Sequence, residues 1–437
     1  MNIWQKIVQI WQIRDLRKKI LFVFGILIVF RLAAHIPVPG VDVSNLKNFF
    51  NSNQVLGLLN VFSGGALENF SVVMLGLSPY ITATIIFQLL AMIIPKLAEL
   101  QKEGERGQQK INQYSRILTV PLAILQAYGT ITVLRRSGQG ATGGLSSVPG
   151  GIIGDLSPFQ LATAIVAIVA GSMFLMWLGE LISEKQIGNG ISLLIFAGIV
   201  AGVPSAVQKT LAVFDPTKLA GLLAFVVVGV ITIAGVVFIT EGQRNIPVAY
   251  ARQIRGRRMY GGTSTHLPMR VNQAGVIPII FAISLLLLPS VVAQFFAQSK
   301  SAALANFAHG VVNLFNNQIF YGGFYFLLVV VFTYFYTAVI FHPDQISENL
   351  QKQGGFIPGI RPGMQTAVYL NKVSNRILLT GALFLGVIAI LPFVMQAATG
   401  LSTLVVGGTS LLIVVSVVIE TVKQINAQLQ MRDYEGF

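Results

Sequence analysis

Long apolar stretches separated by short polar ones set the pattern of this sequence. A helix needs roughly 20 mostly apolar residues to cross a bilayer, and ten stretches have about that length. They are continuous apolar runs, without the alternation of polar and apolar residues that a transmembrane β-barrel uses. The pattern predicts an all-α polytopic membrane protein. The predicted spans cover residues 20–36, 72–95, 117–134, 158–179, 191–209, 219–240, 274–297, 321–341, 377–397 and 402–422.

The composition agrees with this class of protein. Apolar residues make up 54% of the chain and charged residues 11%, and the mean hydropathy is +0.72. A soluble domain of this size would carry far more charge on its surface. The chain has no cysteine, which excludes disulfides and thiolate metal sites.

The order of the spans predicts two halves, residues 1–212 and 213–437. Five spans fall in each half, so the two halves have opposite orientations in the membrane, as in proteins built from inverted repeats. The second half has two large polar loops, residues 241–272 and 341–376, whereas the first half has only one, residues 96–116. The count of spans therefore supports the repeat better than the loops do.

The basic residues predict the orientation of the chain. If the N-terminus is cytoplasmic, 23 of the 30 Lys and Arg residues lie on the cytoplasmic side and only six on the other. Cytoplasmic loops carry such an excess of positive charge, so both termini are expected in the cytoplasm. The most basic loop has a single acid, Glu241, and six arginines: Arg244, Arg252, Arg255, Arg257, Arg258 and Arg270.

Residue patterns typical of catalysis are missing from this sequence. The four histidines are far apart, and none has the spacing of a metal ligand. There is no phosphate-binding glycine loop and no pairing of a nucleophile with a base. We therefore expect no catalytic residue, no metal and no cofactor. An intramembrane enzyme, one alternative class, would need such groups within its spans.

A secondary transporter is the other alternative class. Ion-coupled transporters place carboxylates or histidines at the middle of the membrane to bind the driving ion. The only ionisable candidates near a span are Arg31, Glu180 and Glu420, and all three lie towards helix ends. The transporter interpretation is weaker for that reason.

Three local patterns stand out. In residues 77–90 a proline precedes a helix in which Ile81 and Ile85 share a face. In residues 177–199 a Gly-Asn-Gly turn opens a helix in which Ile191 and Ile195 are also four apart. In residues 354–363 glycines and prolines set an unusual backbone around Arg361.

Together with residues 271–278 and 407–413, these patterns resemble the SecY family, the central subunits of protein-conducting channels, and the resemblance covers essentially the whole chain. Two small departures are Gln186, where glycine is common, and His342, where asparagine is often found. The resemblance implies an hourglass channel between the two halves, closed at mid-membrane by a ring of apolar side chains. Without the family, each isoleucine would be expected to face lipid or a neighbouring helix. The implied ring is Ile81, Ile85, Ile191, Ile195, Ile280 and Ile413.

The resemblance also implies a plug at about residues 55–69, a small helix that folds back into the external funnel. The alternative for this segment is an ordinary external loop. A lateral gate is implied between the second and third helices on one side and the seventh and eighth on the other. Gly64 and Gly65 would supply the hinge of the plug; the plug residues implied are Leu58, Leu59, Phe62, Gly64 and Gly65.

The family implies that this chain acts with partners in the bacterial cytoplasmic membrane. Arg257, Arg258 and Arg361 match the arginines that contact the ribosome or the SecA ATPase. The other interpretation, which we favour for Arg244 and Arg270, is that arginines only fix the topology and pair with lipid phosphates. SecE would clamp the two halves, and SecG would lie at the periphery. Signal peptides, nascent secretory chains and membrane lipids complete the expected partners.

Overall fold

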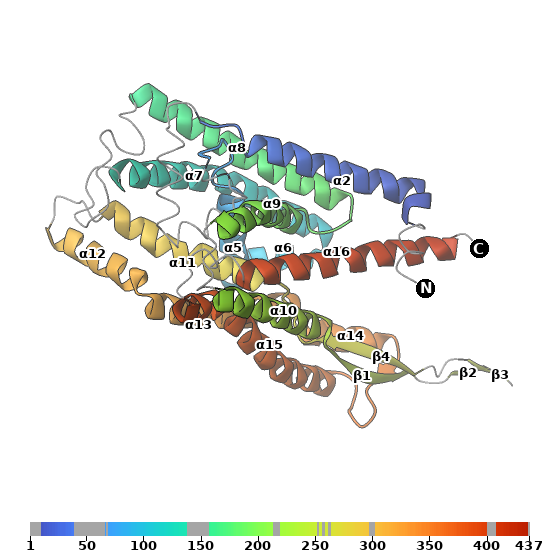
Figure 1. Ribbon diagram of the computed structural model, residues 1–437. Coiled ribbons are helices and arrows are strands. Elements are labelled where there is room, and N and C mark those ends of the chain that lie inside the picture. The colour runs from blue at the N-terminus through green and yellow to red at the C-terminus, as the bar shows by residue number, and fades with distance from the viewer. Residues whose placement is uncertain are drawn as a thin grey trace.

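The structure is a computed structural model, and it describes residues 10–38, 66, 69–137, 157–212, 219–250, 253–255, 258–260, 264–296, 302–399 and 408–435. Long helices run side by side through the molecule (Figure 1). The start of the first labelled helix and the end of the last lie at the same end as a strand hairpin. That both termini lie on the cytoplasmic side with the basic loop stays a prediction from the sequence.

The helices of the first half pack in chain order. Helix α5 packs on α7, α7 on α8, and α8 on α9, while α2 lies against α8 and α9. A break at Ile94 bends α6 by 110° away from α5, because Pro95 cannot continue the hydrogen-bonding of the preceding helix. The six helices are α2 (Arg14–Ala33), α5 (Ser78–Ile93), α6 (Pro95–Lys102), α7 (Glu105–Ser137), α8 (Pro158–Glu184) and α9 (Gly190–Ala212).

The second half holds seven helices in its described residues. Helix α13 packs against α11 and α15, and α16 packs against α10 and α15. Two short helices were not predicted: α12 follows α11, and α14 follows α13. The seven are α10 (Leu219–Glu241), α11 (Ile277–Phe296), α12 (Ala302–Asn316), α13 (Gln318–Ile340), α14 (Pro343–Lys352), α15 (Met364–Thr399) and α16 (Gly408–Glu435).

Each of the ten predicted spans overlaps a helix of the structure. By length and composition alone, four helical stretches within the described residues can cross a bilayer, and the bent pair α5–α6 adds a fifth. The four stretches lie on α8, α13 with α14, α15 and α16. Helices α9, α10 and α11 carry shorter apolar stretches, so the count of ten remains a prediction from the sequence.

The basic loop at 241–272, for which no secondary structure was predicted, forms antiparallel strands. Strand β1 (Gln243–Tyr250) pairs with β4 (Ser264–Arg270), and β5 (Gly355–Phe356) pairs with the other edge of β1. A second hairpin of β2 (Gln253–Arg255) and β3 (Arg258–Tyr260) lies beyond the first (Figure 1). The two large loops of the second half are therefore joined in one sheet, which we call the hairpin sheet (β1, β4 and β5).

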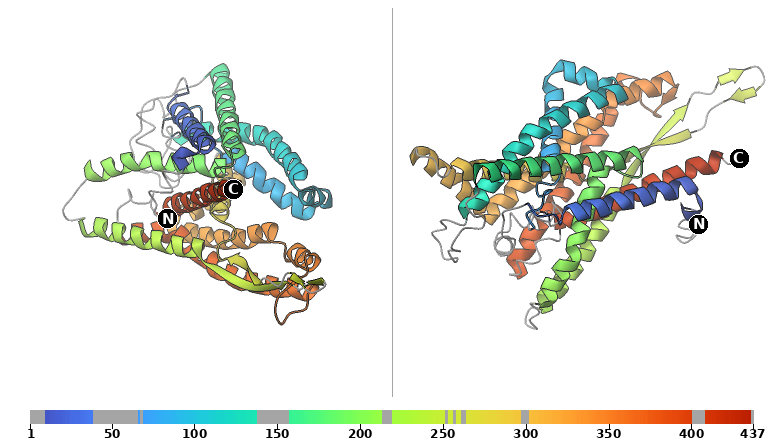
Figure 2. Two further views of the ribbon diagram at one scale, coloured as in Figure 1. Left: turned by 90° about the vertical axis from the view of Figure 1, so that its right-hand side faces the viewer. Right: turned by 90° about the horizontal axis from the view of Figure 1, so that it is seen from above.

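The two halves meet along two seams. Helix α11 packs against α5 and α7, and α16 packs against α9. Figure 2, left, shows the helices of the first half in one layer and most of those of the second half in the other. One large hydrophobic core joins both halves, with buried residues from α2, α5, α8, α9, α10, α11, α13, α15 and α16.

Candidate functional site

All six isoleucines of the predicted ring lie in the core that joins the two halves. Those on α11 and α16, Ile280 and Ile413, are buried, as are Ile85 on α5 and Ile195 on α9. The remaining two, Ile81 and Ile191, are partly buried and pack against the same core. The six residues come from four helices and from both halves of the chain, and we call them the isoleucine cluster.

Helix α9 begins with a cap and a close helix contact. The side chain of Asn189 accepts hydrogen bonds from the backbone N–H of Ile191 at 3.1 Å and of Ser192 at 3.2 Å, which satisfies donors that a helix start leaves open. A Cβ on Gly190 would clash with the backbone carbonyl of Gly179 on α8. Only glycine allows this approach, and it sets the position of the isoleucines that follow.

The turn before α9 contains the departure at Gln186. Its φ is 59°, in the left-handed region where glycine avoids the steric cost of a Cβ. The side chain of Gln428 on α16 donates a hydrogen bond to the backbone carbonyl of Gln186 at 2.7 Å. This bond ties the turn to the second half and does not involve the Gln186 side chain.

Helix α5 carries the other isoleucine pair. Pro79 lies in the first turn of this helix, where its missing N–H costs nothing. Thr82 and Thr84 donate their hydroxyl protons to the carbonyls one turn earlier, each at 2.9 Å. The two hydroxyl groups are thus hydrogen-bonded within the helix, and they need no partner on the side that carries Ile81 and Ile85.

Buried polar side chains occur close to the seam between α5 and α11. Oε1 of Gln88 on α5 has no hydrogen-bond partner within the described part of the chain, and the same holds for Oδ1 of Asn272 and Oε1 of Gln273, just before α11. The side-chain nitrogen of Asn272 donates to the carbonyl of Gly275 at 3.1 Å. An unpaired buried polar atom costs roughly 1–3 kcal/mol.

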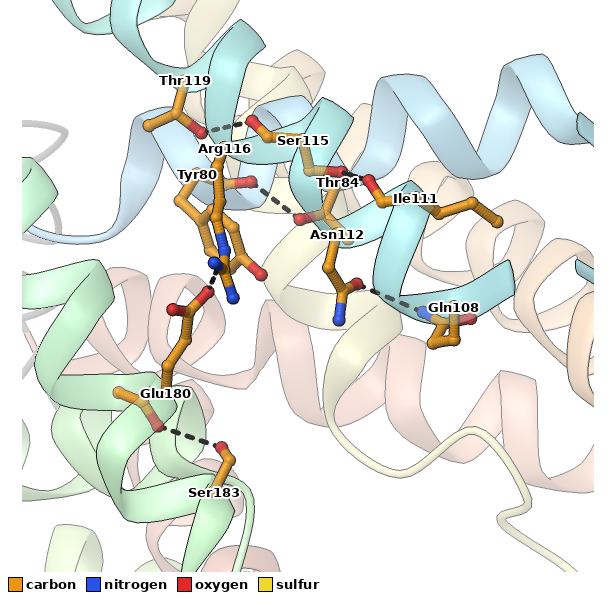
Figure 3. A network of polar contacts seen from close by, with 11 residues as sticks. Tyr80, Thr84, Gln108, Ile111, Asn112, Ser115, Arg116, Thr119, Glu180 and Ser183 are labelled. Carbon is orange, nitrogen blue, oxygen red and sulfur yellow. Dashed lines mark hydrogen bonds and ion pairs between the residues drawn. The ribbon is translucent and has the colours of Figure 1, made fainter. Parts of the chain in front are cut away.

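An ion pair that the sequence reasoning missed links α7 to α8. Nε of Arg116 donates to Oε1 of Glu180 at 2.6 Å, and Figure 3 shows Tyr80 of α5 beside the pair. Arg116 directly precedes one predicted span, and Glu180 directly follows the next. Consecutive antiparallel spans bring these two ends to the same depth, and that signal was available in the sequence.

Two of the three predicted docking arginines, Arg258 and Arg361, lie at the end of the molecule that holds the strands. Arg257 is outside the described residues. The backbone of Arg258 belongs to β3, where it pairs with Arg255 of β2. Arg361 is exposed, in the turn between β5 and α15. The pairing of β5 with Ala249 and Tyr250 thus brings the segment before Arg361 to the end of β1 that leads into the β2–β3 hairpin.

The turn around Arg361 is held by hydrogen bonds at both sides. Thr366 donates its hydroxyl to the carbonyl of Arg361 at 2.9 Å, and Ser347 of α14 donates to the carbonyl of Gly363 at 2.6 Å. Gly359 and Gly363 have φ of 83° and 92°, which other residues rarely adopt. A small apolar core lies under the turn: Ile246, Val248, Met269, Ile357, Leu370 and Val373.

Electrostatics differ between the two regions. The isoleucine cluster contains no ionisable group. On the side of the hairpin sheet, Lys352 and Glu348 form an exposed ion pair at 2.8 Å, and the ammonium of Lys352 lowers the pKa of the Glu348 carboxyl. A third ion pair joins Lys423 of α16 to Glu241 at the end of α10 at 2.8 Å.

The predicted plug residues, from Leu58 to Gly65, lie outside the described residues.

Comparisons with known proteins agree with this arrangement. The chain is 48% identical to the protein translocase subunit SecY of Streptomyces galbus, over 97% of each chain. It is 45% identical to the subunit of the same name in Mycobacterium bovis, again over 97% of each. Among solved structures, a protein-conducting channel matches with a TM-score of 0.61 at 17% identity, over 94% of this chain and 91% of that one. Sec61 from a canine ribosome–channel complex matches with a TM-score of 0.59 at 17% identity, covering the same shares.

These matches confirm the expected helical membrane fold, because the solved channels share it along almost the whole chain. A family model described as SecY matches residues 71–422, which include all six isoleucines, the hairpin sheet and the Arg361 turn. The chain belongs to the SecY family.

Proposed function

We propose that this chain is the channel subunit of a bacterial protein translocase and has no catalytic activity of its own. It passes unfolded secretory polypeptides across the cytoplasmic membrane and releases apolar segments sideways into the bilayer. One observation carries the proposal: in a member of the SecY family, six isoleucines from both halves of the chain gather in one core. The family's relatives are named as translocase subunits.

The isoleucine cluster acts as the constriction of the channel. Apolar walls exclude water and ions by dewetting, and they deform around a passing chain without binding any particular sequence. Four of the six side chains are buried, which suits a resting constriction. The plug at about residues 55–69 adds a second seal on the external side, in keeping with a solved SecY relative described as having a plug domain that maintains a membrane seal.

The seam of α11 against α5 and α7 acts as the lateral gate, together with α13, which packs on α11. Its unpaired polar atoms on Gln88, Asn272 and Gln273 support this assignment, because a seam with unsatisfied groups opens at lower cost than a fully apolar one. Each leucine or isoleucine that passes through the gate favours lipid by a few tenths of a kcal/mol. The other seam, α16 against α9, stays closed. The two halves, residues 1–212 and 213–437, turn about this seam when the lateral gate opens.

The hairpin sheet and the Arg361 turn dock cytoplasmic partners. Two solved relatives were studied in complexes with ribosomes, and ribosomal RNA is a polyanion that exposed arginines bind with strong salt dependence. Arg257, Arg258 and Arg361 make this contact to the ribosome or to SecA, which also supplies the energy. SecE and SecG complete the channel, and both termini of this chain are cytoplasmic, as its basic loops predict.

A crosslinking experiment tests the constriction. The chain has no cysteine, so Ile191→Cys introduces a single thiol in the isoleucine cluster. The matched control is Ile231→Cys on α10, whose side chain is 64% exposed on the outside of the molecule. With a secretory chain stalled in the reconstituted translocase, we expect a crosslink from position 191 and none from 231. Absence of a crosslink at 191, with one at 231, would contradict the assignment of the isoleucine cluster as the constriction of the channel.

A further inference from the structure

Helix α12 presents apolar residues on a side that no helix of the described residues covers. Leu304, Phe307 and Leu314 are spaced three and seven residues apart, which places them on one side of the helix. All three are exposed, Phe307 to 74%. A neighbouring side of the helix faces the protein, where Ala308 is buried and Phe315 packs on the main core. We call the three exposed residues the α12 stripe.

The remaining side of α12 is polar but uncharged. Asn306, His309 and Asn313 follow one another at intervals of three and four residues, and all are exposed. No Lys, Arg, Asp or Glu occurs between Ala302 and Asn316. An amphipathic helix with a large apolar side is typical of the boundary between lipid and water. Exposed contiguous apolar side chains on a segment surrounded by water would instead need a covering partner.

The orientation of α12 is fixed by aromatic contacts. The Phe315 ring lies 5.6 Å from that of Phe320 and 5.9 Å from that of Phe324, both edge-on, and the latter two rings stack at 5.9 Å. Asn317 caps α13 by accepting from the N–H of Ile319 at 3.0 Å. Because these contacts join α12 firmly to α13, the exposed stripe is a consequence of the packing.

The stripe continues into surface that belongs to membrane-spanning helices. Helix α12 packs against α11 and α13, and it lies at the end of the molecule opposite the hairpin sheet (Figure 1). Directly after it, Ile319 and Phe320 at the start of α13 are exposed too, Ile319 to 87%. Helix α13 is part of a stretch long and apolar enough to cross a bilayer, so its outer surface meets acyl chains.

We propose that the α12 stripe is a lipid-contact surface: it inserts among the acyl chains of the leaflet opposite the hairpin sheet, with Asn306, His309 and Asn313 towards the headgroups and water. The occupant is the bilayer itself, because the apolar surface is continuous with that of α13 and the polar side carries no charge for a protein or nucleic-acid partner. This inference concerns a surface that the proposed channel function does not use.

Fluorescence quenching tests the lipid contact. Phe307→Cys and Leu314→Cys place a thiol-attached, environment-sensitive dye on the stripe, and Asn306→Cys and Asn313→Cys place it on the polar side. All four positions are exposed, so the labels do not disturb the core, and secretory-chain translocation by each labelled full-length protein checks that it is folded. The proteins are reconstituted into phosphatidylethanolamine–phosphatidylglycerol vesicles that carry nitroxide-labelled acyl chains or have iodide in the surrounding water.

Lipid contact predicts strong quenching by the nitroxide lipids and protection from iodide at 307 and 314, with the reverse at 306 and 313. Equal iodide quenching on both sides would overturn the proposal, since the stripe would then face water. Protection of 307 and 314 from both quenchers would also overturn it, because protein would then cover the stripe.

Discussion

The isoleucine cluster and the hairpin sheet lie at two depths of the same molecule and are held by different interactions. The cluster depends on shape: its side chains come from four helices of one hydrophobic core, and Gly190 lies so close to the Gly179 carbonyl that no Cβ fits between α9 and α8. The sheet depends on hydrogen bonds that join two distant loops, and it carries charge. The proposed constriction would touch a substrate without holding it, whereas the proposed docking face would hold its partner.

The largest expected effect breaks the shape of the constriction. Gly190→Ala forces its Cβ into the carbonyl of Gly179, and we expect the free energy of unfolding to fall by roughly 3 kcal/mol, the upper part of the range for overpacked sites. Gly202→Ala is the matched control in the same helix, since its Cβ would meet nothing within 4 Å. Thermal unfolding in detergent measures both; similar melting temperatures would contradict the close-contact argument.

The second effect changes the chemistry of the proposed constriction and keeps the number of side-chain heavy atoms. Ile195→Asn introduces an amide whose preference for water is about 1–3 kcal/mol, so we expect the ion leak of reconstituted vesicles to rise roughly tenfold, which corresponds to about 1.4 kcal/mol. Ile195→Leu is the apolar control and should leave the leak unchanged. An equal leak in the two variants would show that dewetting at this residue does not provide the seal.

The third effect distinguishes arginines that contact a cytoplasmic partner from arginines that only fix the topology of the chain in the membrane. Arg257→Ala with Arg258→Ala should weaken ribosome binding and make the slope of log affinity against log salt shallower by about 1.5, because each phosphate contact contributes roughly 0.7–0.9. Arg244→Ala with Arg270→Ala removes the same charge from strands β1 and β4 of the same loop and should change the slope little. If both pairs change it equally, the arginines act only through net charge.

The smallest effect concerns the turn that leads into the constriction. Gln186→Gly relieves a left-handed backbone and should raise the free energy of unfolding by about 1 kcal/mol, without loss of the Gln428 hydrogen bond, which uses the backbone. Gln353→Gly, at a residue with φ of −85°, is the control and should be neutral or destabilising. Lower melting temperatures for both variants would show that strain at Gln186 is negligible.

The sequence predicted the local features of the site well. The Gly-Asn-Gly segment does begin a helix, and the glycine common in place of Gln186 corresponds to a left-handed φ. Helix starts depend on caps and prolines within a few residues, which explains this success. The strands of the hairpin sheet were missed because Arg-rich polar sequence carries a weak strand signal, and because β5 joins β1 from about a hundred residues away.

The sequence by itself determined that this chain is a helical membrane protein and roughly where its apolar helices lie, and it predicted which side of the bilayer its basic loops favour. Those properties follow from local hydropathy, charge and capping, which act over about twenty residues or fewer. Only the tertiary structure placed Ile81, Ile195, Ile280 and Ile413 in one core, paired Arg116 with Glu180, and left the α12 stripe exposed among the described residues. Each of these depends on which helix faces which, and in an apolar membrane that choice is made by close packing between distant segments.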